Sequence, residues 1–259
     1  MEIPYYQIDA FASRVFSGNP AGVCFLDQWL DDRRLQSIAA ENCLPETAFL
    51  VAAAHDYELR WFTPKVEIDL CGHGTLASAH AVFRYSTFSA ARVDFQTKSG
   101  TLSVTRQGDL LEMDFPSRRP VPCEKPDHLD EILGLSPITT LRARDLMAVY
   151  ETEEQIRGLK VDFDIMAGLD CFGVIVTAPG RTSDFVSRFF APGAGIPEDP
   201  VTGSAHCTLI PYWSERLGKK KLHAFQVSER GGELFCVDRG DRVTIGGKAV
   251  TYLSGTITV

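Results

Sequence analysis

Two segments of small and apolar residues, one in each half of the chain, restrict the fold more than any other feature. The first, residues 74–83, follows Cys71-Gly72-His73, and the second starts at Thr202-Gly203-Ser204 and runs to about residue 217. Such segments favour buried helices around which strands pack. Strand patterns surround both, so the sequence predicts an α+β protein of two similar lobes, each a mostly antiparallel or mixed sheet wrapped around a central helix.

The length and a proline cluster indicate where the lobes meet. A chain of 259 residues fits two ordinary domains. Residues 116–122 hold three prolines in seven positions and have no apolar period, which is typical of a linker. We therefore predict lobes at 1–116 and 117–250, with an active-site cleft between them.

Local signals predict further elements. Asp31 or Asp32 caps an amphipathic helix over 30–41, and Thr152 to Gln155 forms a capping box. Alternating patterns predict strands at 46–53, 57–62, 92–98, 101–107, 110–115, 145–150, 171–177 and 184–190.

Charge and cysteine usage exclude several kinds of partner. With 26 Lys and Arg against 34 Asp and Glu, the net charge of −8 disfavours nucleic acid and anionic membranes. A small anionic substrate stays compatible, because a helix terminus acts at close range. The chain has no apolar run long enough to span a membrane and no secretory signal at its start, and its seven scattered cysteines contain no C-x-x-C pair. We expect a cytoplasmic protein with free thiols.

Two irregular segments of the first half are candidates for chemistry. Residues 17–23, with Asn19 at their centre, suit a tight turn with exposed backbone donors, or a plain hairpin loop. Glu46 begins an otherwise apolar strand. A buried carboxylate is costly unless it is paired or protonated, so Glu46 is a candidate general acid and base; alternatively it points to solvent.

The two helix entrances are the other candidates. A helix N-terminus presents unpaired N–H groups that hold an anionic oxygen, and Gly72, Gly74 and Thr75 surround His73 at the first entrance. This terminus should disfavour the charged form of His73. At the second, Asp199 precedes Pro200, and Thr202 or Ser204 is a candidate cap, followed by Gly203.

Other common chemistries are not indicated. Cys71, His73, His80, His206 and Cys207 are metal-ligand types, but their spacing matches no standard zinc pattern. Phosphate-loop, dinucleotide-binding and serine-nucleophile signatures are absent from the sequence. We therefore expect no metal and no nucleotide cofactor.

Five motifs together resemble the PhzF-like family of phenazine-biosynthesis isomerases, over nearly the whole chain. They are Asp9-Ala10-Phe11 with Gly18-Asn19-Pro20-Ala21-Gly22, Pro45-Glu46-Thr47-Ala48-Phe49, Phe62-Thr63-Pro64, Cys71-Gly72-His73-Gly74-Thr75 and Glu198-Asp199-Pro200-Val201-Thr202-Gly203-Ser204-Ala205-His206. The resemblance implies the diaminopimelate-epimerase fold, the return of about residues 251–259 to the first lobe, and a possible homodimer.

The resemblance also implies roles for individual residues. The family's catalytic glutamate falls on Glu46, and its assisting polar residues fall on His73, Asp199 and Ser204. Glycines 72, 74 and 203 would let backbone donors approach a substrate carboxylate, with Asn19, Thr75 and Thr202 beside them. The implied activity is a cofactor-independent isomerisation of a small carboxylic acid by proton transfer between carbons.

Two alternatives remain open. Racemases of the same superfamily use two opposed cysteines; Cys71 occupies the first position, whereas Pro200 aligns with the second and the nearest thiol is Cys207. A thiol-assisted amino-acid epimerase that uses Cys71 is thus one alternative. The other is a binding or adaptor protein that keeps the fold without turnover.

Overall fold

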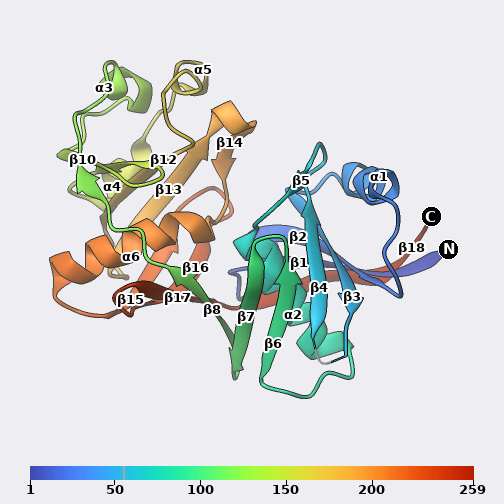
Figure 1. Cartoon of the computed structure of the whole chain (residues 1–259). Helices are drawn as coiled ribbons and strands as arrows, with labels where there is room; N and C mark the ends of the chain where they lie inside the picture. The colour runs from blue at the N-terminus through green and yellow to red at the C-terminus, as the bar shows by residue number, and fades with distance from the viewer. Residues whose placement is uncertain (55) are drawn as a thin grey trace. The chain divides into compact units, whose positions relative to one another are not determined.

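The chain divides into two compact units in the computed structural model, which describes residues 1–54 and 56–259. Unit 1 comprises residues 1–114 and 246–259, and unit 2 comprises residues 115–245. Both units mix sheet with helices, which confirms the predicted α+β class (Figure 1). In the described part of the chain, no helix has both the length and the apolar character that crossing a membrane requires.

Unit 1 is a mixed sheet with two helices. Its strands lie in the order β18, β1, β2, β3, β4, β6, β7, β8, and the short β5 pairs with β4. Their bounds are β1 (Glu2–Ala10), β2 (Asn19–Leu26), β3 (Glu46–Ala52), β4 (Tyr57–Phe62), β5 (Glu67–Ile68), β6 (Arg92–Thr97), β7 (Gly100–Gln107), β8 (Leu110–Pro116) and β18 (Ala249–Thr258).

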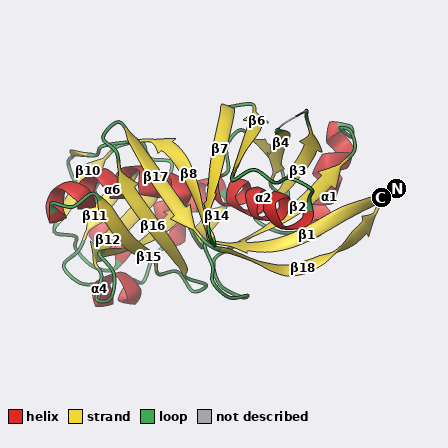
Figure 2. Ribbon diagram, turned by 90° about the horizontal axis from the view of Figure 1, so that it is seen from below, coloured by secondary structure: helices red, strands yellow, loops and turns green. Residues whose placement is uncertain are grey.

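Helix α2 (Gly72–Tyr85) is the central helix of unit 1. It packs against β1, β2 and β3 (Figure 2), and Leu76, Ala77, Ala79 and Ala81 are fully buried. The other helix, α1 (Asp32–Asn42), begins at the predicted cap, since the Asp31 carboxylate accepts the Arg34 N–H, and it ends where Cys43 adopts a left-handed conformation.

Unit 2 repeats this plan. Its strands are β9 (Val121–Pro122), β10 (Thr139–Arg142), β11 (Leu146–Val149), β12 (Val174–Pro179), β13 (Phe185–Ala191), β14 (Ile196–Asp199), β15 (Lys221–Gln226), β16 (Gly232–Asp238) and β17 (Arg242–Gly247), of which β17 runs past residue 245 into unit 1. Its helices are α3 (Leu129–Leu133), α4 (Glu153–Gly158), α5 (Phe163–Met166), the 3₁₀ turn η1 (Pro192–Ala194) and α6 (Gly203–Leu217). The predicted capping box at Thr152 is confirmed at the start of α4.

The strand pairings show that the two units are internal repeats. In unit 1 the pairs β1/β2, β2/β3, β3/β4, β4/β6 and β6/β7 are antiparallel, parallel, antiparallel, parallel and antiparallel. In unit 2 the pairs β10/β11, β11/β12, β12/β13, β13/β15 and β15/β16 follow the same sequence of directions. The second parallel connection contains α2 in unit 1 and α6 in unit 2.

The predicted linker is held by backbone hydrogen bonds to unit 2. The Ser117 N–H donates to the Asp241 carbonyl and the Arg118 N–H donates to the Cys207 carbonyl. The Cys207 carbonyl is available because Pro211, one turn later inside α6, has no N–H to donate to it.

The turn predicted at residues 17–23 is placed wrongly. The chain turns earlier, where Phe16 N–H donates to Asp9 and Gly18 adopts a positive φ of 68°. Residues from Asn19 onward form the buried strand β2. Pro20 misled the prediction: it sits at the start of the strand, where the loss of one N–H is tolerated.

Candidate active site

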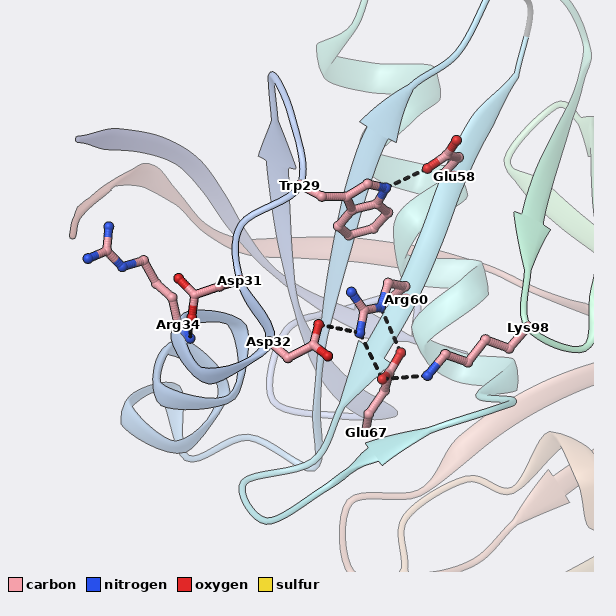
Figure 3. A network of polar contacts seen from close by, with 8 residues as sticks. All are labelled: Trp29, Asp31, Asp32, Arg34, Glu58, Arg60, Glu67 and Lys98. Atoms are coloured by element: carbon pink, nitrogen blue, oxygen red, sulfur yellow. Dashed lines mark hydrogen bonds and ion pairs between the residues drawn. The ribbon is translucent and has the colours of Figure 1, made fainter.

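An arginine–glutamate pair stands before each central helix. In unit 1, Arg60 of β4 binds both carboxylate oxygens of Glu67 on β5, at 2.7 and 2.8 Å, and Lys98 and Asp32 extend the network (Figure 3). Figure 3 also shows Trp29 donating to Glu58 nearby. The hydrogen bond from Arg60 lowers the pKa of Glu67 to about 2, so the pair stays ionised at neutral pH. This pair anchors the segment that leads into α2.

Unit 2 has the same pair at the matching place. Arg188 of β13 binds Glu198 of β14 at 2.7 and 2.9 Å. Each arginine also lies over the phenylalanine two residues later, at 5.1 Å for Phe62 and 4.9 Å for Phe190. Each glutamate precedes the first residue of its helix by the same number of residues, so both entrances start from one template.

The entrance of α2 is capped by Cys71. The Cys71 sulfur accepts the Gly74 N–H at 3.3 Å, and the Thr75 hydroxyl donates to the Cys71 carbonyl at 2.6 Å. A Cβ on Gly74 would lie 2.8 Å from the Trp61 indole and 2.9 Å from the Cys71 sulfur, so no side chain fits there. Gly72 is half-buried at the first helical position. Thr75 is buried, and its hydroxyl proton is already used in the hydrogen bond to the Cys71 carbonyl.

Glu46 and His73 form a buried ion pair at this entrance. Glu46 Oε2 lies 2.7 Å from His73 Nε2, and the two side chains are only 9% and 8% exposed. The interpretation that Glu46 points to solvent is therefore wrong. Asn19 at the start of β2 completes the group, with Nδ2 3.2 Å from His73 Nδ1.

The environment favours a charged His73. Burial alone would lower its pKa, but the Cys71 sulfur and the Glu46 carboxylate together raise the pKa well above its ordinary value. Burial and Glu46 raise the pKa of Cys71, so its sulfur is a thiol at neutral pH and Glu46 is the anion that holds the imidazolium. The helix terminus disfavours the charged form, as expected from the sequence, but the adjacent carboxylate outweighs the helix dipole.

Metal-ligand types also meet at this point. One ligand atom from each of Glu46, Cys71 and His73 lies within 4.8 Å of the others. A cation there would have to displace the existing ion pair and the Gly74 N–H from the cysteine sulfur. The three side chains are thus arranged for hydrogen bonding and ion pairing with one another.

The entrance of α6 is built from hydrogen bonds among Asp199, Thr202 and Gln226. Thr202 occupies the cap position, but its hydroxyl donates to Asp199 Oδ2 at 2.5 Å and does not cap the helix. The fully buried Gln226 of β15 joins the group: its oxygen accepts the Thr202 N–H at 2.8 Å and its nitrogen donates to the Asp199 carbonyl at 2.7 Å. Gly203 is buried, and Ser204 is half-buried in the first turn of α6.

The structure thus distributes the predicted residues over two groups. Unit 1 brings together Glu46, His73, Asn19, Cys71 and the glycines of the α2 entrance, and unit 2 brings together Asp199, Thr202, Gly203 and Ser204. Sequence reasoning missed Gln226 and the two arginine–glutamate pairs. For Gln226, the available signal was a glutamine at the end of an alternating strand, at a position where burial would demand hydrogen-bond partners.

Comparisons with known proteins show which family the chain belongs to. Residues 8–255 match the family model PhzC-PhzF, described as phenazine biosynthesis-like protein. A Pseudomonas aeruginosa protein named an uncharacterized isomerase is 53% identical over 257 residues, covering 99% of each chain. The crystal structure of a PhzF-family phenazine biosynthesis protein from Enterococcus faecalis is 45% identical, with a TM-score of 0.99 over all of both chains.

More distant structures support the predicted epimerase-like fold. A probable proline racemase from Agrobacterium radiobacter superposes with a TM-score of 0.64 over 99% of this chain and 93% of its own, at 10% identity, which concerns the fold alone. The family resemblance seen in the sequence is confirmed. The chain belongs to the PhzC-PhzF family of phenazine biosynthesis-like proteins.

Proposed function

We propose that this protein is an isomerase of a small carboxylic acid, in which Glu46 moves a proton between two carbons of the substrate without a cofactor. The buried Glu46–His73 ion pair at the α2 entrance carries the proposal. Membership of a family whose similar members are named isomerases supports the reaction class.

The proposed reaction needs one base that serves twice. Glu46 takes a proton from a substrate carbon, and the electron pair of the broken C–H bond enters a conjugated system that ends on the substrate carboxyl group. The protonated Glu46 then gives the same proton to another carbon, where the new C–H bond forms. No electrons leave the substrate, so the step is an isomerisation.

His73 keeps this base in place and ionised. An imidazolium 2.7 Å from the carboxylate stabilises the anion in a dry site, where the attraction is stronger than in water. A protonated His73 donates at both ring nitrogens, so Nδ1 needs an acceptor. We propose that the Asn19 amide, whose Nδ2 lies 3.2 Å from Nδ1, is turned over so that its oxygen accepts this hydrogen bond. We propose that Asn19 fixes the ring and that the backbone N–H of Gly72 favours the developing anion, since the Gly74 N–H already donates to the Cys71 sulfur.

The residues at the α6 entrance have proposed roles in recognition. Asp199 and Ser204 are the polar side chains predicted to assist the reaction, and Thr202 and Gly203 are predicted to contact substrate. The hydrogen bonds around Gln226 fix Asp199 and Thr202 in one arrangement, as a binding group requires.

Proton exchange in heavy water tests the proposal. The protein is incubated with a panel of unsaturated, dihydro-anthranilate-like and amino acids, and deuterium incorporation at carbon is followed by NMR. Exchange with the wild type that is lost in Glu46→Gln is the expected result. Exchange that persists in Glu46→Gln would overturn the assignment of the base.

A second candidate, a thiol-assisted epimerase, rests on the Cys71 sulfur lying 3.6 Å from His73 Nδ1. The raised pKa of Cys71 counts against this candidate, because the thiolate is the reactive form of cysteine. Cys71→Ala separates the two: exchange survives if Glu46 is the base and collapses if the thiol is. If no acid exchanges and none raises the melting temperature, the binding-protein alternative is favoured.

A further inference from the structure

A pocket lies in unit 1, apart from the Glu46–His73 pair. It has a volume of about 370 Å³, within the range of small-molecule sites. Its walls come from the later part of α2, the β7–β8 turn, the chain before and within the start of β18, and residues 12–13 after β1. His80 and Arg84 lie roughly two and three helical turns beyond His73 on α2, so the pocket is distinct from the proposed proton-transfer site.

The pocket carries an excess of positive charge. Arg84, Arg106 and Lys248 line it, against one carboxylate, Asp109. Over residues 1–54 and 56–259, no ion pair joins any of these three cations to an acidic side chain. The chain as a whole carries a net charge of −8, so unneutralised cations gathered around one cavity need an explanation.

Two of the cations are held by neighbouring aromatic side chains. The Arg106 guanidinium lies 4.8 Å from the centre of the Phe83 ring. Arg84 donates to the Tyr85 hydroxyl at 3.2 Å, and that hydroxyl donates to Thr251 at 3.0 Å. Ordering these side chains before a ligand arrives reduces the entropy that binding must offset.

Lys248 and His80 also line the pocket. Lys248 is half-buried, and its carbonyl accepts the Ala12 N–H at 3.0 Å, which fixes its backbone. His80 Nε2 lies 3.0 Å from the Thr251 hydroxyl. Burial and the charge of Arg84 lower the pKa of His80 to about 4, so the ring is neutral at pH 7 and the pocket has a surplus of about two positive charges.

We propose that this pocket binds a small organic dianion, a phosphate monoester or a dicarboxylate, at a site separate from the one that contains Glu46. Arginine forks and a lysine ammonium bind the doubly charged group, since both chemistries present oxygens that accept charge-assisted hydrogen bonds. Phe83, Leu111 and Val250 form apolar wall against which the organic part packs.

Isothermal titration calorimetry at low ionic strength tests the proposal, with inorganic phosphate, phenyl phosphate, succinate and acetate as probes. The expected result is saturable binding of phosphate or succinate, weaker binding of the monoanion acetate, and further weakening by added sodium chloride. Tighter phosphate than succinate would assign a phosphate ester, the reverse a dicarboxylate, and tighter phenyl phosphate than phosphate would support the apolar wall.

Four variants locate the site. Lys248→Gln and the exposed Arg106→Gln should each weaken dianion binding at least about tenfold, the loss of one charge-assisted contact. Arg33→Gln, an exposed arginine on α1 outside the pocket, and Glu46→Gln should bind as the wild type does. Because Glu46→Gln abolishes the proposed isomerisation but not this binding, the two proposals fail separately.

Three results would overturn the proposal. They are no saturable binding of any dianion, acetate binding as tight as succinate, and dianion binding that Glu46→Gln weakens while Arg106→Gln and Lys248→Gln do not. Arg106 is exposed on the β7–β8 hairpin, so its replacement tests the site even if Lys248→Gln disturbs folding.

Discussion

The same structural position holds a glutamate in one unit and a glycine in the other. Thr47 pairs with Phe62 in unit 1, and Val174 pairs with Phe190 in unit 2. Phe62 and Phe190 are equivalent, because each lies under the arginine of its arginine–glutamate pair. Their strand partners, Thr47 and Val174, are therefore equivalent as well. The residues that precede these partners are Glu46 and Gly173, so these two occupy matching positions. A Cβ on Gly173 would lie 2.4 Å from the Phe189 ring, so an aromatic side chain fills the space.

This difference distinguishes the features that both units share from the features that each unit has alone. Both units supply an arginine–glutamate pair and a helix N-terminus. Unit 1 adds a buried carboxylate and imidazole beside its helix, whereas unit 2 adds the Gln226 amide, which bonds to both the backbone and the side chain of Thr202. The two units thus share the same framework, and under the proposed function proton transfer depends on one residue of the strand beside α2.

The largest expected effect is on turnover, and it should differ between variants at the α2 entrance and variants at the α6 entrance. On a substrate identified by proton exchange, Glu46→Gln should lower kcat by roughly 10² to 10⁴, the usual contribution of a general acid–base group. Asp199→Asn should cost less and act mainly on KM, because its proposed role is in recognition. Steady-state kinetics decide this, and an equal loss of kcat in both variants would contradict the division of roles.

Gln226→Leu should destabilise the protein by about 2–4 kcal/mol. The change leaves the buried Thr202 N–H and the Asp199 carbonyl without their partner, and each unsatisfied group costs about 1–3 kcal/mol. Urea denaturation measures the loss. Gln107→Leu, on the exposed β7–β8 hairpin, is the matched control and should change the unfolding free energy by less than about 0.5 kcal/mol.

Gly173→Ala should cost about 1–3 kcal/mol, because the new Cβ meets the buried Phe189 ring and lies 3.1 Å from the Phe190 carbonyl. Gly158→Ala on α4 meets nothing within 4 Å and should be neutral or slightly stabilising. Thermal melting of both variants provides the comparison. Equal melting temperatures would mean that unit 2 has room for a side chain where unit 1 has its glutamate.

The buried His73 and His206 should have pKa values on opposite sides of the ordinary value. The pKa of His73 is raised, so its contribution to stability is fully present below about pH 6.5 and is lost as the pH rises through the elevated pKa. Burial lowers the pKa of His206 to about 4, so the folded state loses stability as the pH falls from about 6.5 towards 4. NMR titration of the imidazole signals measures both.

Glu46→Gln sharpens the same measurement. Without the carboxylate, burial dominates and the pKa of His73 should fall, while that of His206 in the other unit should not move. A His73 signal that still titrates above 6.5 in this variant would show that Cys71, and not Glu46, holds the proton on the ring.

Local signals in the sequence predicted most elements, because caps and alternation act over a few residues. The α1 cap at Asp31, the capping box at Thr152 and the strands that begin at Glu46 and Tyr57 all follow from such patterns. Glu46 and His73 were singled out because a carboxylate in an apolar strand and a histidine between glycines are unusual on packing grounds alone.

The parts that sequence reasoning missed depend on strand register. Gln226 reaches Thr202 only because β15 runs parallel beside β13, and Arg60 meets Glu67 only because β5 folds back on β4. The charge of His73 likewise depends on a residue in another strand. No local pattern encodes these contacts, so the argument from the helix dipole could not fix the protonation state of His73.

The strand that completes unit 1 has a consequence for the order of assembly. β18 pairs along β1, and the Ala12 N–H bonds to Lys248, yet both belong to a segment that follows all of unit 2 in the chain. A ribosome therefore releases the contiguous unit 2 before β1 receives this neighbour. The sheet of the unit that contains the Glu46–His73 pair is therefore completed last, after all of unit 2 has been synthesised.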